Sequence, residues 1–95
     1  MDYELLKSIQ ESSEELMRRM PVRSVWFSME NYPEFSGVLL DGRTFRIRWS
    51  WEGVLDRFSV NTLSWRSQFE SPQAFIRRLG LRPPVGTWHD RLGSV

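Results

Sequence analysis

The sequence has no cysteine, one lysine and one histidine among its 95 residues. Without cysteine the chain can form neither a disulfide nor a zinc–thiolate site. With His89 as the sole histidine, a metal site built on two histidines is excluded, and a Ser-His-Asp triad would have to use that residue. Because Lys7 is the only lysine, arginine carries almost all of the positive charge, and its planar fork pairs with carboxylates, phosphates and aromatic rings.

Motifs for catalysis or cofactor binding are also missing. The 6 glycines are dispersed, and none belongs to a glycine-rich loop followed by Lys-Ser or Lys-Thr, which excludes a phosphate-binding loop. The carboxylates of the central region are scattered over expected turns and strand ends, where acids commonly have structural roles. We therefore predict that the chain is not an enzyme and binds no cofactor and no metal.

Charge and hydropathy place further limits on the chain. The formal net charge is +1, which directs it neither to nucleic acid nor to a membrane surface. No apolar run approaches the length of a membrane span, and the acidic, amphipathic start does not resemble a signal peptide. With 95 residues, 40% of them hydrophobic, the sequence predicts one small globular domain, 1–95, located in the cytoplasm.

Two helices are expected, one on either side of the central region. Residues 1–20 carry apolar side chains at helical spacing, with Asp2 as the N-cap and Pro21 as the stop signal. Residues 71–80 begin with Ser71-Pro72, a favoured helix start, and end at a glycine. Each helix therefore has a recognisable beginning and end in the sequence.

The region between these helices, 22–63, alternates apolar and polar residues in four short runs, which predicts a four-stranded antiparallel meander. The apolar face of such a sheet needs a cover, and the two helices are the elements of the right shape. The expected fold is therefore α+β with two layers, in the order helix, four strands, helix, followed by an irregular tail at 82–95.

The pairing of these strands follows from the turns between them. Asp41-Gly42 is the strongest hairpin signal, because both residues tolerate the positive φ of a two-residue type I′ turn. This turn pairs Val38 with Phe45, and four-residue loops at 31–34 and 52–55 set the remaining pairs. The helix-covered face then collects Val25, Phe27, Met29, Val38, Leu40, Phe45, Ile47, Trp49, Phe58 and Val60.

The opposite face of the sheet carries the candidate binding residues. Aromatic and aliphatic side chains lie there beside arginines, a composition typical of protein interfaces. We expect a small protein-binding module, an adaptor, inhibitor or assembly subunit such as an accessory factor of a phage or other mobile element, whose partner is another protein. The predicted partner-binding residues are Trp26, Phe35, Leu39, Arg46, Arg48, Arg57 and Trp88.

Two other interpretations of this face remain open. Single-stranded nucleic acid could stack its bases on Trp26 and Phe35 while arginines meet the phosphates, although the weak net charge argues against it. The face could instead be covered, either by Trp88 of the tail or by a second copy in a face-to-face homodimer.

Overall fold

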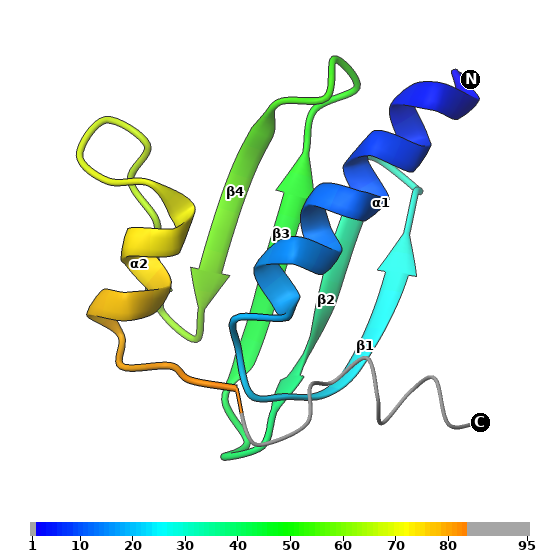
Figure 1. The fold of residues 1–95 in the computed structure, drawn as a ribbon. Helices are drawn as coiled ribbons and strands as arrows, with labels where there is room; N and C mark the ends of the chain where they lie inside the picture. The colour runs from blue at the N-terminus through cyan, green and yellow to red at the C-terminus, as the bar shows by residue number, and fades with distance from the viewer. Residues whose placement is uncertain (1, 84–95) are drawn as a thin grey trace.

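The computed structural model describes residues 2–83, which form a two-layer α+β fold (Figure 1). All strand pairs are antiparallel, and the strands follow chain order across the sheet. Neither helix within residues 2–83 has the length and apolar content needed to cross a bilayer. The elements are α1 (Tyr3–Met17), β1 (Val22–Ser28), β2 (Glu34–Leu39), β3 (Thr44–Trp49), β4 (Leu55–Val60), β5 (Leu63–Ser64) and α2 (Pro72–Arg78).

The predicted helix, antiparallel meander and second helix are therefore confirmed, with one addition. The run expected as a single strand over 56–63 is broken by a turn at Asn61 and Thr62, and Leu63 pairs back onto Val60 as the short strand β5. Asn61 adopts a positive φ of 52°, a conformation that asparagine tolerates better than most residues.

The signals at the helix ends act as the sequence predicts. The Asp2 side chain accepts hydrogen bonds from the first-turn amides of α1, and Ser71 Oγ accepts the amide of Ala74 at 3.1 Å. At the end of α2, Gly80 has a φ of 71°, and the Leu81 amide donates to the carbonyl of Ile76 at 3.2 Å. This pattern of a left-handed glycine followed by a buried leucine closes the helix.

A carboxylate in the segment before α2 fixes the helix to that segment. Glu70 accepts hydrogen bonds from Nε and Nη2 of Arg78, each at 3.0 Å. The Arg78 hydrogen bonds lower the pKa of Glu70, and the same carboxylate raises the pKa of Arg78.

Both helices pack on the same face of the sheet, and the core lies between the two layers (Figure 1). Phe58 of β4 meets Phe75 of α2 edge to face, with ring centroids 5.1 Å apart. The strongly buried apolar side chains are Ile9, Leu16, Met17, Met20, Val22, Leu39, Phe45, Ile47, Trp49, Phe58, Val60, Phe75, Ile76 and Leu81.

One buried hydrogen bond joins the two layers. The indole Nε1 of Trp49 donates to Ser13 Oγ at 2.7 Å, and the Ser13 side chain is fully enclosed. Ser13 interrupts the apolar stripe of α1, and its hydroxyl satisfies the one polar atom that Trp49 carries into the core.

The β2–β3 hairpin differs from the predicted two-residue turn. Leu39 N–H donates to the Arg43 carbonyl at 2.7 Å and Gly42 N–H to the Leu39 carbonyl at 3.0 Å, so the loop contains three residues, 40–42. Gly42 takes a positive φ of 92°, whereas Asp41 does not, as in a type I turn followed by a glycine bulge. The Arg43 amide donates to the Asp41 carboxylate at 3.0 Å and, with the Arg43 guanidinium, lowers the pKa of Asp41.

This longer loop shifts the β2–β3 register by one residue and reverses the faces of β2. Gly37, rather than Val38, lies opposite Phe45. Leu39 is fully buried in the core, whereas Val38 lies on the other face and Leu40 is exposed in the turn. The predicted inward positions of Val38 and Leu40 are therefore wrong.

The predicted registers of the β1–β2 and β3–β4 pairs also differ from those in the structure. The β1–β2 connection is five residues long, 29–33, and pairs Phe27 with Phe35 rather than with Val38. The β3–β4 pairing differs from the prediction by two residues, with Ile47 opposite Phe58, and a shift of two keeps every side chain on its predicted face.

The buried hydrogen bond between α1 and β3 gives a direct test of this packing. Ser13→Ala leaves the Trp49 indole N–H buried without its acceptor, and we expect the free energy of unfolding to fall by roughly 1–3 kcal/mol in urea denaturation. In a Trp49→Phe background the donor is absent, and the same substitution should cost less. An equal cost in both backgrounds would contradict this role for the hydroxyl.

Candidate functional site

The face of the sheet opposite the helices, here called the open face, holds the candidate site. The strand registers place on it the side chains of Ser24, Trp26, Ser28, Glu34, Ser36, Val38, Thr44, Arg46, Arg48, Arg57 and Ser59. The face therefore combines one large aromatic ring, three arginines and several small hydroxyl side chains.

Trp26 is the most prominent apolar group on the open face. Its side chain remains 55% exposed, although it lies on a strand of the sheet. The register sets Trp26, Ser36, Arg46 and Ser59 side by side across β1 to β4. Because its cross-strand neighbour is a serine, the indole has no bulky side chain directly beside it.

Two of the three arginines on the open face are held by carboxylates. Arg46 Nε lies 3.4 Å from an oxygen of Glu34, which belongs to the neighbouring strand β2. Arg48 lies 2.7 Å from Asp56 through Nη2, and its guanidinium also sits over the Tyr32 ring, 5.0 Å from the centroid. These contacts orient both guanidinium groups and neutralise much of their charge.

Arg57 differs from the other two arginines. It lies directly opposite Arg48 in the β3–β4 ladder, so that two like charges are neighbours on one face. Arg48 has Asp56 as its partner, whereas Arg57 forms no ion pair with any residue in the range 2–83. Within that range, Arg57 is the arginine of this face whose charge is least compensated.

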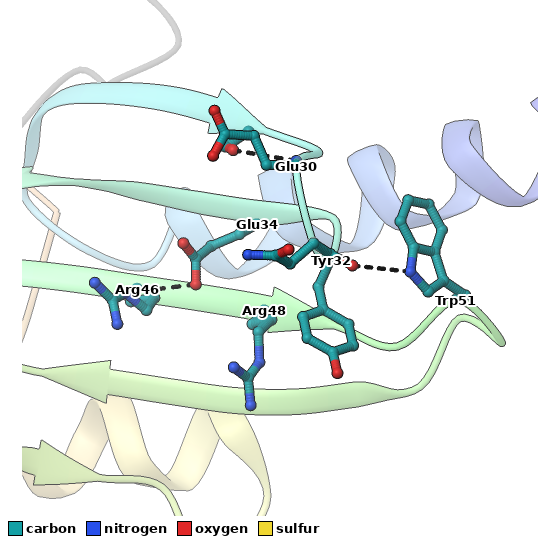
Figure 2. A pocket seen from close by; sticks show the side chains of 8 residues that line it. Glu30, Tyr32, Glu34, Arg46, Arg48 and Trp51 are labelled. Atoms are coloured by element: carbon teal, nitrogen blue, oxygen red, sulfur yellow. Dashed lines mark hydrogen bonds and ion pairs between the residues drawn. The ribbon is translucent and has the colours of Figure 1, made fainter.

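Two hollows of about 620 and 540 Å³ lie side by side on the open face and share Ser28, Glu34 and Arg46. The first is closed at one end by aromatic residues of the two adjacent loops (Figure 2), where Trp51 Nε1 donates to the Asn31 carbonyl at 2.9 Å. The second lies beside Trp26. Together they form a groove that runs from Trp26, past the Glu34–Arg46 pair, to the aromatic loops.

The structure brings together some of the predicted partner-binding residues and separates others. Trp26, Arg46, Arg48 and Arg57 share the open face, as predicted. The placement of Phe35 and Leu39 on that face is wrong, and the reversed faces of β2 are the reason.

Phe35 instead pairs with Phe27, with ring centroids 4.6 Å apart, and packs against the core on the helical side. Leu39 is completely buried and cannot contact a partner in this conformation. Trp88, the remaining predicted contact, lies outside the described residues 2–83.

Four residues that line the groove or contact its arginines were not identified from the sequence. Glu34 and Asp56 are among the carboxylates expected at turns and strand ends, but each forms an ion pair with an arginine of the open face. Tyr32 and Trp51 occupy loops, and only the folded structure brings those loops together (Figure 2). One acid near the start of β2 and one near the start of β4, on the two strands that flank the arginines of β3, form the signal that could have revealed the two ion pairs.

Comparison of the chain with family models, with curated proteins and with solved structures finds no match. Within residues 2–83, no group of three or more His, Cys, Asp or Glu side chains is arranged to hold a metal ion.

The assignment of Trp26 to the surface and of Leu39 to the core can be tested by the free energy of unfolding of two variants. Trp26→Ala removes a side chain that contributes little to the packed interior, and we expect its unfolding free energy to change by about 0.5 kcal/mol or less. Leu39→Ala opens a cavity in the core and should cost about 2–5 kcal/mol. Urea denaturation of both variants tests the assignment, and a larger loss for Trp26→Ala than for Leu39→Ala would refute it.

Proposed function

We propose that this chain is a non-enzymatic protein-binding module, an adaptor, inhibitor or assembly subunit, that holds its partner against the open face. The observation that supports this proposal best is the 55% exposure of Trp26 at the end of a groove lined by oriented arginines. Tryptophan and arginine are the residues most enriched among the side chains that dominate binding energy in protein interfaces. A partner that encloses the Trp26 ring would remove this large apolar surface from water.

The charges of the groove favour a protein partner over single-stranded nucleic acid. Glu34 and Asp56 lie within ion-pair distance of Arg46 and Arg48, and a phosphate approaching either arginine would meet a carboxylate as well. Nucleic-acid affinity depends mainly on uncompensated positive charge. A polypeptide, in contrast, can supply both an acid and a base to groups of mixed sign.

The same ion pairs suggest how a protein partner would bind. Exposed ion pairs contribute little to stability, so that Arg46 can exchange its contact with Glu34 for a partner carboxylate at small cost. Glu34 would then be available to a basic group of the partner. We therefore expect a partner segment with an apolar side chain next to Trp26 and charged side chains of both signs along the groove.

Site-specific photo-crosslinking identifies the partner and tests the face. A photoreactive amino acid at Ser36 or Ser59 of the open face should capture one protein in cells of the source. The same amino acid at Gln10, on the exposed side of α1, serves as the control. Capture that is as strong from Gln10 as from the open face would contradict the proposed surface.

The captured partner then allows a quantitative prediction. By calorimetry, Trp26→Ala should weaken binding by a factor of about 30 or more, the loss of roughly 2 kcal/mol expected for a dominant interface residue. Arg46→Glu should weaken it through charge reversal, whereas Lys7→Ala on α1 should leave affinity unchanged. Full affinity in both open-face variants would overturn the proposal.

A titration with labelled single-stranded oligonucleotides tests the alternative function. We expect no binding at low salt. Binding that weakens steeply as salt increases, and that is lost on Arg57→Glu, would favour the nucleic-acid function instead.

A further inference from the structure

Within residues 2–83, the outer edge of β1 is a second surface that no other element of the fold pairs with. β1 is the first strand in the sheet order, so that only one of its sides is paired by β2 within residues 2–83. It spans Val22–Ser28, whereas β5 at the opposite edge has only two residues. β1 contains no proline, lysine or acidic residue, the features that commonly protect an edge strand, and its single charge, Arg23, lies at the register shift near the start of the strand.

The hydrogen-bonding groups on this edge can be assigned from the ladder. Leu39 donates to the Arg43 carbonyl, and Trp49 donates to the Pro33 carbonyl, so the odd-numbered residues of β2 bond toward β3. The even-numbered residues of β2 therefore bond toward β1, where Ser36 lies opposite Trp26. By the same alternation, the amide and carbonyl groups of Val25 and Phe27 point away from β2, toward the open edge.

We propose that β1 pairs with β1 of a second copy of this chain, antiparallel and with the two Trp26 residues opposite each other. In this register, residues 24–28 of one copy pair along their whole length with residues 24–28 of the other copy. Val25 of one copy then lies opposite Phe27 of the other, and both residues carry the outward amide and carbonyl groups that an antiparallel pair exchanges. Registers centred on residue 25 or 27 would instead use the irregular start of β1 or the loop after its end.

The side chains match in this register as well as the backbones do. Serine meets serine at positions 24 and 28, and Val25 meets Phe27, a residue that is still 41% exposed at the sheet edge. The charges are complementary, because Arg23 near the start of β1 lies opposite Met29 of the second copy, one residue before Glu30, which its long side chain can reach. Two such contacts form, one at each end of the paired strands.

The resulting dimer keeps the two layers of the fold intact. A two-fold axis perpendicular to the sheet places the helices of both copies on one side and both open faces on the other. The sheet becomes continuous across the axis, and two Trp26 rings meet at its centre. Because β1 is only about 23 Å long, the contact is small, and we expect association in the micromolar range.

Cysteine trapping tests the register, since the chain has 0 cysteines of its own. Directly opposite residues of a non-hydrogen-bonded antiparallel pair have Cα atoms about 4.5 Å apart, within the range that a disulfide spans. Under mild oxidation, Trp26→Cys should form a covalent dimer. Ser24→Cys and Ser28→Cys should each remain largely monomeric alone but cross-link when mixed. Equal cross-linking of every single variant, or none for Trp26→Cys, would overturn the proposal.

Charge reversal tests the same contact without altering the strand residues that pair. Sedimentation velocity over a range of concentrations should show a monomer–dimer equilibrium for the unmodified chain. Arg23→Glu should weaken dimerisation at least tenfold, because it brings two acids together, and Arg23→Glu with Glu30→Arg should restore it. A monomer at every concentration, or no rescue in the double variant, would refute the edge pairing. Neither result bears on the open face, whose partner binding is measured separately.

Discussion

The alternation of side chains along β3 determines which face of the sheet the helices cover. Phe45, Ile47 and Trp49 are buried on one side of the strand, and the indole of Trp49 is fixed to α1 by its hydrogen bond to Ser13. A strand that buries three large apolar groups in this way cannot rotate without exposing them. Arg46 and Arg48 are consequently directed to the other side, where each lies near a carboxylate from an adjacent strand.

The open face exists because of where the two helices pack. Both pack against the same side of the sheet (Figure 1), and none of the elements in residues 2–83 covers the other side. The residues left there are mostly small or charged, as in other antiparallel sheets with one solvated face. Trp26 departs from this pattern, and that departure supports the proposed binding function.

The features that depend on local chemistry could be predicted from the sequence. The N-caps Asp2 and Ser71, the glycine end of α2 and the inward side of β3 each require only a few neighbouring residues, and the structure contains all of them. The open-face positions of Trp26 and Arg46 follow from the same alternation.

The faces of β2 could not be predicted in this way. Asp41-Gly42 suits a two-residue turn and also a three-residue loop in which only Gly42 needs positive φ, so the dipeptide does not define the register. The segment 35–40 has apolar residues at both odd and even positions, and either orientation buries some of them.

Gly37 decides between the two orientations of β2. A Cβ atom there would clash with the Ser24 carbonyl oxygen and lie only 2.7 Å from the Phe45 ring, so the position opposite Phe45 requires a residue without a side chain. That contact exists only after the strands have paired. The sequence alone therefore does not show that β2 turns its odd residues inward.

The hydrogen bond from the Trp51 indole to the Asn31 carbonyl holds together the two loops at one end of the groove. It joins the connection between β1 and β2 to the connection between β3 and β4, two exposed segments that are far apart in the sequence. The aromatic side chains at that end of the groove, Tyr32 and Trp51, are therefore in place without a bound partner. If the proposed partner docks at this end of the groove, the hydrogen bond reduces the conformational entropy that the two loops lose on binding.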